Sequence, residues 1–166
     1  MTRSSAREIA IHIVYELSFG TDRAEEVLDR ELTRERFQVL EAESELYRQF
    51  PNEKQVQYIR DLVKGVFAHG AELDDYIARY AKGWSFARIP RMAAAIMRTA
   101  MYEVLYVPDV PNAAAINEAV EIAKRYETQE VVSFVNGILG SFVRAEFADT
   151  PPKPEKADDS QPKAED

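Results

Sequence analysis

Apolar residues recur every three or four positions along most of this chain, which is the spacing of one face of an α-helix. The first such run extends over residues 6–17. The segment 5–8, with the sequence Ser-Ala-Arg-Glu, has the spacing of a capping box just before this run. The pattern therefore predicts a helix that begins at this box and runs to about Phe19, and Gly20 is expected to end it.

Three further segments complete the first half of the pattern. Asp22 is predicted to cap a second helix. Residues 33–50 mix apolar and charged positions without a clear period, so this segment is either a helical extension or an exposed insertion. After Pro51 the spacing of three and four resumes and continues to Ile77, which predicts one long helix that ends at Lys82-Gly83.

The second half predicts three more helices. Pro90 suits the first turn of the fourth helix, because its missing N–H has no partner there in any case. The rigid connector 107–111 ends with Pro111, which opens a fifth helix, and a sixth helix follows Tyr126. No segment alternates convincingly at period two, so we predict an all-α fold with two small helical groups, before and after Gly83.

The last eighteen residues, 149–166, differ from the rest of the chain. They combine four prolines with lysine and acidic residues. Such a segment buries too little apolar area to offset the entropy of ordering it, so we expect a disordered, acidic tail. The predicted helical domain therefore covers residues 1–148, with subdomains of about 1–82 and 83–148.

Positive charge is concentrated in one stretch of an acidic chain. The formal net charge is −8, of which residues 22–53 contribute −5 and the tail −3. Between Tyr76 and Tyr102 there is no acid, and this separation predicts a basic surface for an anionic partner, with an ordinary solvated face as the alternative. The bases in the stretch are Arg79, Lys82, Arg88, Arg91 and Arg98, of which Arg88, Arg91 and Arg98 are predicted RNA contacts.

The sequence lacks the residues of common catalytic sites. It has no cysteine, and its two histidines, His12 and His69, are far apart without metal-ligand spacing. No phosphate-binding loop or nucleophile elbow is present. We therefore expect no enzymatic activity, no metal and no cofactor. No apolar run approaches the ~20 residues needed to cross a bilayer, so we expect a cytoplasmic protein without a membrane partner.

Three pairs of residues are further candidates for binding. Two arginines one helical turn apart near the N-terminus suit phosphates, although surface arginines are common there. A phenylalanine close to an asparagine suits a stacked base and a base edge, with core packing as the alternative. A tyrosine and a phenylalanine one turn apart form either core or an aromatic patch for a partner protein. The pairs are Arg3 and Arg7, Phe134 and Asn136, and Tyr15 and Phe19.

Several blocks of the sequence together resemble the NusB transcription antitermination family. Ile-Asn-Glu-Ala at 116–119 and Phe-Val-Asn-Gly at 134–137 are the specific ones. All the blocks stand in family order between Ala6 and about Val143, leaving out residues 22–53. They are residues 6–8, Tyr15, 60–66, 73–74, 98–103, 109–111, 115–124 and 134–139.

The resemblance implies an all-helical fold of two small bundles and a partnership with the ribosomal protein NusE. It implies recognition of boxA, a single-stranded RNA segment, and read-through by RNA polymerase in ribosomal RNA operons, with other Nus factors linking the complex to the polymerase. By position it implies RNA contacts for Arg3, Arg7 and Phe134, and NusE contacts for Tyr15 and Phe19. Some relatives form homodimers, so the resemblance also allows that state.

The chain departs from the family pattern at Ser4 and Ser5, which replace part of a run of arginines. Fewer phosphate contacts mean weaker binding and a smaller salt dependence, so we expect a stronger need for NusE. Two other interpretations are a helical scaffold that binds only proteins, and an accessory RNA-binding domain related to those of RNA cytosine methyltransferases.

Overall fold

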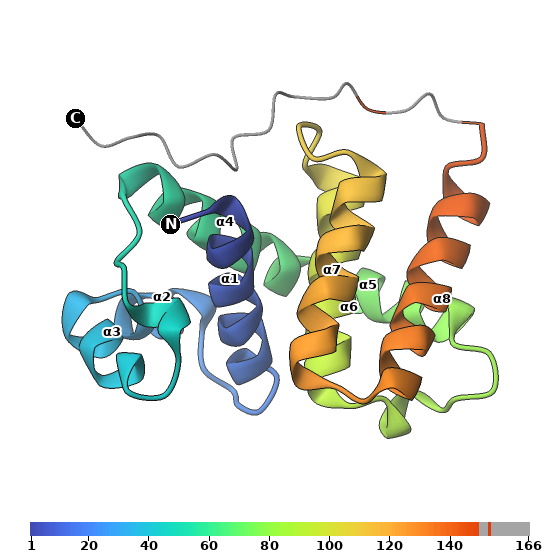
Figure 1. Cartoon of the computed structure of the whole chain (residues 1–166). Coiled ribbons are helices and arrows are strands. Elements are labelled where there is room, and N and C mark those ends of the chain that lie inside the picture. Colours follow the sequence, from blue (N-terminus) through green and yellow to red (C-terminus); the bar gives the residue numbers. More distant parts are fainter. Residues whose placement is uncertain (150–152, 154–166) are drawn as a thin grey trace. The chain divides into compact units, whose positions relative to one another are not determined.

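A computed structural model describes residues 1–149 and Lys153 of the chain. All regular elements in this part are helices, as Figure 1 shows, so the predicted all-α fold class is confirmed. The predicted disordered tail, residues 149–166, lies outside the described residues except at its first residue and at Lys153.

The chain divides into two compact units. The first is Met1–Phe67, and the second begins at Ala68. The sequence predicts a boundary near Gly83, where a helix ends, and the structure instead places the helix before Gly83 in the second unit. The difference arises because a helix end is visible in a sequence, whereas the choice of packing partners on either side of it is not.

The single long helix predicted after Pro51 is wrong, because two helices occupy this stretch. α4 (Glu53–Ala68) and α5 (Gly70–Tyr80) are separated by His69, whose φ of −102° and ψ of 17° lie outside the helical range. Apolar spacing continues through the break, so periodicity does not reveal it. The glycine that begins α5 is a poor helix former and is the local signal for an interruption.

A small aliphatic core holds the first unit together. α1 (Arg3–Leu17) packs against α2 (Ala24–Glu31), and α2 is linked to α4 by ion pairs from Arg60 to Asp29 and from Lys64 to Glu25. Each fully buried aliphatic side chain contributes about 1.5–3 kcal/mol relative to an exposed one. The central members are Ile9 and Ile13 of α1, Val27 and Leu28 of α2, and Ile59 and Val63 of α4.

The helix starts in this unit differ from the predicted ones. The N-cap of α1 is Thr2, whose hydroxyl accepts a hydrogen bond from the Ser5 N–H at 3.0 Å, so α1 begins earlier than predicted. Asp22 is not the cap of α2, because the N-cap is Arg23, which makes no side-chain cap bond. Several polar residues stand near each start, and the sequence does not show which one meets a free N–H.

Residues 33–50, which the sequence leaves open between two alternatives, form a small aromatic cluster. Phe37 is 3% exposed and packs edge-on against Tyr47 and Phe50, with ring centroids 5.1 and 5.0 Å away. The segment is therefore a folded part of the first unit rather than an extension of α2 or an exposed insertion. Its elements are α3 (Arg34–Glu41) and the short 3₁₀ helix η1 (Glu45–Tyr47).

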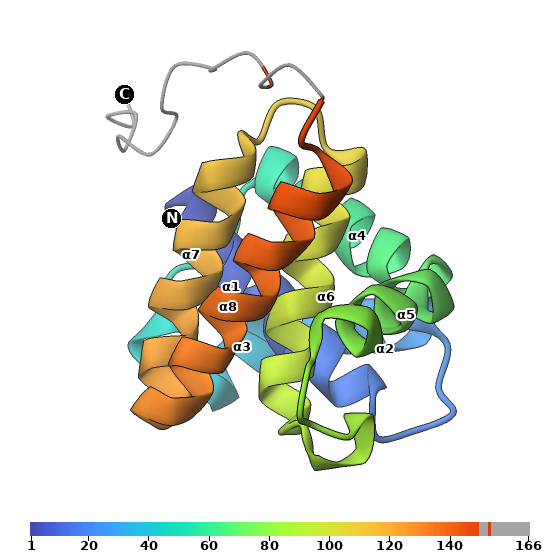
Figure 2. The same ribbon diagram turned by 90° about the vertical axis from the view of Figure 1, so that its right-hand side faces the viewer.

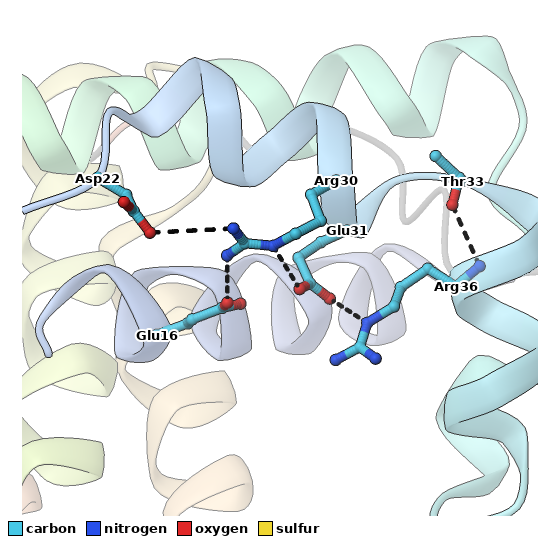
Figure 3. Close-up of polar contacts among 6 residues, drawn as sticks. All are labelled: Glu16, Asp22, Arg30, Glu31, Thr33 and Arg36. Carbon is cyan, nitrogen blue, oxygen red and sulfur yellow. Dashed lines mark hydrogen bonds and ion pairs between the residues drawn. The ribbon is translucent and has the colours of Figure 1, made fainter. Parts of the chain in front are cut away.

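An ion-pair network joins α1, α2 and α3, as drawn in Figure 3. Arg30 lies 2.6 Å from Glu16 and 3.9 Å from Asp22. The side chain of Asp22, the predicted cap of α2, therefore faces Arg30 in this network. Glu31, with a side chain only 10% exposed, lies 2.9 Å from Arg36 and 3.5 Å from Arg30. Two arginines thus compensate one nearly buried carboxylate.

The second unit is a bundle in which α6 is the central helix (Figure 2). α6 contacts α5, α7 and α8, and the five residues Ala93–Met97 are all at most 5% exposed. Five consecutive buried residues cover every side of this part of the helix, so it lies inside the bundle, and its alanines let neighbouring helices approach closely. The elements after α5 are η2 (Phe86–Arg88), α6 (Arg91–Tyr106), α7 (Asn112–Tyr126) and α8 (Gln129–Glu146).

The three helices predicted for the second half are confirmed. Pro90 and Pro111 occupy the N-cap positions of α6 and α7, one residue before the first turn. In either place a proline has no N–H to leave without a partner, and its fixed φ suits a helix start.

Candidate nucleic-acid interface

The two N-terminal arginines lie one turn apart on α1 in the first unit. The guanidinium carbon of Arg3 lies 4.7 Å from the ring centroid of Tyr58, a cation–π distance. Arg7 is only 6% exposed, whereas Arg3 is half-buried. Arg3 is therefore the more accessible of the two, and its guanidinium is already oriented by an aromatic ring.

The structure brings Tyr15 and Phe19 together at the C-terminal end of α1. Their ring centroids are 4.8 Å apart and the planes meet at 81°, an edge-to-face contact. Phe19 is 57% exposed and Tyr15 is half-buried. The exposed ring of Phe19 favours an aromatic patch over a purely internal role, because aromatic side chains are enriched among residues that anchor protein partners.

Two arginines of the acid-free stretch have acidic partners from outside the stretch. Arg79 lies 2.7 Å from Glu146, and Arg98 lies 2.5 Å from Asp74. Hydrogen bonds from Tyr80 and then Arg79 lower the pKa of Glu146. The side chain of Arg98 is only 16% exposed, so a large part of its surface serves the contact between α5 and α6.

Arg88 and Arg91 remain on the surface of the second unit. Arg88 ends η2 and Arg91 begins α6, on either side of Pro90, and both are exposed. The first turn of α6 contains no acid, and the partial positive charge of a helix N-terminus adds to that of the two side chains. Both arginines therefore bring an exposed positive group to this corner of the unit.

Phe134 is not a core residue, because its side chain is only half-buried. Its ring stacks on Trp84, with centroids 4.5 Å apart and planes tilted by 36°. Asn136 is exposed, but residues two apart on a helix point to different sides, so the structure does not place Asn136 beside the Phe134 ring. The neighbour of Phe134 is the loop before η2.

Trp84 is the candidate that the sequence interpretation missed. It is the only tryptophan of the chain, it lies within the acid-free stretch, and it follows Gly83 directly. These three features of the sequence could have indicated a binding role, because a single tryptophan in a basic loop does not belong to the apolar face of a helix. Its contact with Phe134 joins positions fifty residues apart and has no counterpart in local periodicity.

Within residues 1–149 and Lys153, no three histidine, aspartate or glutamate side chains are grouped so that they could hold a metal ion. Over the same residues no helix combines the length and the apolar character that membrane crossing requires.

Comparison with known proteins identifies the relatives of the chain. The profile of the NusB family matches residues 4–144. The transcription antitermination protein NusB of Acetivibrio thermocellus is 40% identical over 147 residues, which cover 89% of this chain and 92% of that protein. The protein of the same name from Symbiobacterium thermophilum is 36% identical and covers 87% and 90%.

Solved structures agree with this assignment. NusB of T. maritima has a TM-score of 0.71 at 28% identity, covering 87% of this chain and 92% of that one. A chain in the crystal structure of the antitermination factors NusB and NusE with double-stranded RNA has a TM-score of 0.68, covering 86% and 96%, and its 20% identity supports the fold alone. The chain therefore belongs to the NusB family of non-enzymatic transcription antitermination factors.

Proposed function

We propose that this protein is an RNA-binding adaptor in transcription antitermination that recognises boxA-type single-stranded RNA together with NusE. Membership of the NusB family supports the general role. The observation that carries the RNA contact is the half-exposed ring of Phe134, held by Trp84 in the same unit as the exposed Arg88 and Arg91. Aromatic rings beside arginines suit unpaired nucleotides, because rings stack bases and guanidinium groups pair with phosphates.

Each candidate residue has a proposed role. Arg3, Arg88 and Arg91 neutralise phosphates, Phe134 stacks a base, and Asn136 bonds a base edge or the sugar-phosphate backbone. Arg7 and Arg98 are largely buried, so their RNA contacts require that RNA meet the small exposed part of each side chain. Tyr15 and Phe19 form the surface for NusE.

The partner supplies affinity that the chain lacks alone. The chain carries formal net charge −8, so only local patches attract RNA. Once NusE is docked on the chain, its own RNA contact becomes intramolecular, which raises the overall affinity. A homodimer through the Tyr15–Phe19 patch would compete with NusE for the same rings. The place of action is the cytoplasm, where other Nus factors connect the complex to RNA polymerase.

Fluorescence anisotropy with a labelled boxA-type RNA and a scrambled control tests the proposal. We expect weak binding by the chain alone, and binding that is tighter and selective for the boxA sequence when NusE is added. Raising the salt concentration should weaken binding, because phosphate neutralisation releases counterions. Equal binding of both RNAs with NusE present would contradict the proposal, and no RNA binding at all would favour the protein-only scaffold.

A further inference from the structure

Trp84 and Phe134 are two rings held as one unit by the fold of the preceding loop. α5 ends at Tyr80, and the Trp84 N–H donates to the carbonyl of Ala81 at 3.3 Å, which closes a turn. Gly83 has a φ of +84° at the third position of that turn, as a type II turn requires. The turn delivers the indole to α8, and the rings meet at 4.5 Å while both stay half-exposed.

The surface of α8 beside this ring pair is bare backbone. Gly137 lies one turn after Phe134, and a Cβ placed on it would meet no atom within 4 Å. A glycine inside a helix is less favourable than an alanine at the same position. No close packing in the second unit explains that cost at Gly137, so the glycine leaves room for something that approaches the helix from outside.

The same face of α8 continues to an arginine. Positions 134, 137, 141 and 144 share one side of a helix, because they are separated by three or four residues. The guanidinium of Arg144 folds back along the helix, with Nη1 3.1 Å from the position of a Cβ on Gly140 and Nη2 3.4 Å from the Ser141 hydroxyl. From the Phe134 ring this face therefore presents open backbone, a hydroxyl and a cation in succession.

We propose that Trp84 and Phe134 together form the stacking platform for one unpaired base, and that the α8 face from Gly137 to Arg144 carries the adjoining sugar-phosphate backbone. This inference rests on the proposed function and assigns to it three residues, Trp84, Gly137 and Arg144. Trp84 is a positioning residue for the Phe134 ring and widens the aromatic area available to the base. Stacking on a ring tolerates any base, so the platform contributes affinity rather than sequence selectivity.

The charges on α8 favour a course of the bound sugar-phosphate backbone toward the C-terminal end of the helix. Glu130 is exposed one turn before Phe134, and its carboxylate repels phosphates on that side. Arg144 lies on the same face in the C-terminal direction, and its guanidinium reaches Gly140. Gly140 is about 9 Å from Phe134 along the helix axis at 1.5 Å per residue. With bases about 3.4 Å apart in a stacked strand, a phosphate two or three nucleotides from the stacked base meets this cation.

The only tryptophan of the chain is itself the reporter for a test. The complex of the full chain with NusE is titrated with unlabelled boxA-type RNA while tryptophan emission is followed, and a Trp84→Phe complex supplies the signal that comes from NusE. We expect quenching of the Trp84 emission that saturates with the binding curve measured by anisotropy. Binding with unchanged Trp84 emission would overturn the platform while leaving the proposed function intact.

Substitutions test the same surface independently. Trp84→Ala should weaken RNA binding about tenfold, as expected for the loss of base stacking, and Trp84→Phe should stay within about threefold of the wild type. Gly137→Ala should raise the melting temperature yet weaken RNA binding several-fold, a combination that a purely structural glycine does not give. The matched variant Gly70→Ala, at another helical glycine with open space, should leave RNA binding unchanged.

Arg144→Gln should weaken RNA binding and reduce the salt dependence, and Arg125→Gln on α7 is its matched control. Thermal melting of each variant establishes that it is folded, and Trp84→Phe keeps the test valid if Trp84→Ala is not. Unchanged affinity in both Gly137→Ala and Arg144→Gln would overturn the inference. Failure of the wild-type complex to bind boxA-type RNA would overturn the proposed function and the inference with it.

Discussion

Arg98 and Asp74 form a contact that links α6 to α5, with Nε of the arginine 2.5 Å from Oδ1 of the aspartate. The arginine belongs to the acid-free stretch and the aspartate lies just before it. The aspartate is 37% exposed and the arginine 16%, so the pair is partly shielded from water. A stretch that is purely basic in sequence is therefore partly neutralised in space.

Variants of Arg98 and Arg88 separate the contribution of an arginine to stability from its contribution to phosphate binding. Arg98→Met should lower the free energy of unfolding by about 1–2 kcal/mol, because the charge-assisted hydrogen bond from Arg98 to the Asp74 carboxylate is lost. Arg88→Met should leave stability unchanged but reduce the slope of log affinity against log salt by about 0.7, the value for one phosphate contact with a single strand. Urea denaturation and anisotropy at several salt concentrations measure the two effects. A reduced salt slope with wild-type stability in Arg98→Met would instead identify Arg98 as a phosphate contact.

The network around Glu31 gives a second prediction, on stability. Arg36→Met removes the 2.9 Å contact to a carboxylate that is only 10% exposed, so the free energy of unfolding should fall by about 1–2 kcal/mol. The matched variant Arg48→Met removes an exposed pair with Glu45, at 65% and 83% exposure, and should cost about 0–0.5 kcal/mol. Equal losses in urea denaturation would mean that the Arg36–Glu31 contact is no stronger for being partly buried.

The helices of this protein are the part that its sequence predicts best. The spacing of apolar residues locates α6, α7 and α8, because helical periodicity is a local property of the chain. The break at His69 escapes that reasoning, since the apolar residues on either side keep the same spacing. The caps at Thr2 and Arg23 also escape it, because several neighbouring residues have suitable chemistry.

The candidate site was predictable only in part, for a related reason. Residue type and family position indicate Phe134, and the half-exposed ring agrees with a binding role. Its stacking on Trp84 and the pairing of Arg98 with Asp74 depend on which helices and loops pack together. Such contacts join positions that are far apart in the sequence, and no local pattern encodes them.

Lys153 gives a third prediction, on the C-terminal end of α6. Its ammonium group donates hydrogen bonds to the carbonyls of Glu103, Val107 and Val110 at 2.9, 3.1 and 3.1 Å. Cations near a helix C-terminus stabilise it, because the last carbonyls lack helical partners. Lys153→Met should lower the free energy of unfolding by about 1 kcal/mol and speed amide exchange near Val110.

The control for this contact is Lys124→Met, which removes an exposed lysine paired with Glu121 on α7. It should leave both the unfolding free energy and the exchange near Val110 unchanged. If Lys153→Met behaves in the same way as Lys124→Met, the three carbonyls are equally well satisfied by water.

His12 links the stability of the first unit to pH. Its Nδ1 is hydrogen-bonded to the Tyr47 hydroxyl at 2.6 Å, and burial lowers its pKa below the usual 6.5, with the Glu8 carboxylate opposing that effect. The unfolded chain therefore binds more protons than the folded chain once the pH falls below about 6.5. The stability due to neutral His12 is complete above that pH and is lost as the pH falls toward the folded pKa. The free energy of unfolding should therefore decrease as the pH falls below about 6.5.

The variant His12→Gln separates this effect from the titration of carboxylates at lower pH. Glutamine retains hydrogen-bonding capacity and does not titrate, so its urea-denaturation curves should show a smaller loss of stability than the wild type over the same pH range. Tyr47→Phe removes the hydroxyl and keeps the ring, and it should retain most of the wild-type pH slope because burial is the larger cause of the pKa shift. A wild-type slope in His12→Gln would assign the pH dependence to other groups, and a lost slope in Tyr47→Phe would make the hydrogen bond, rather than burial, its origin.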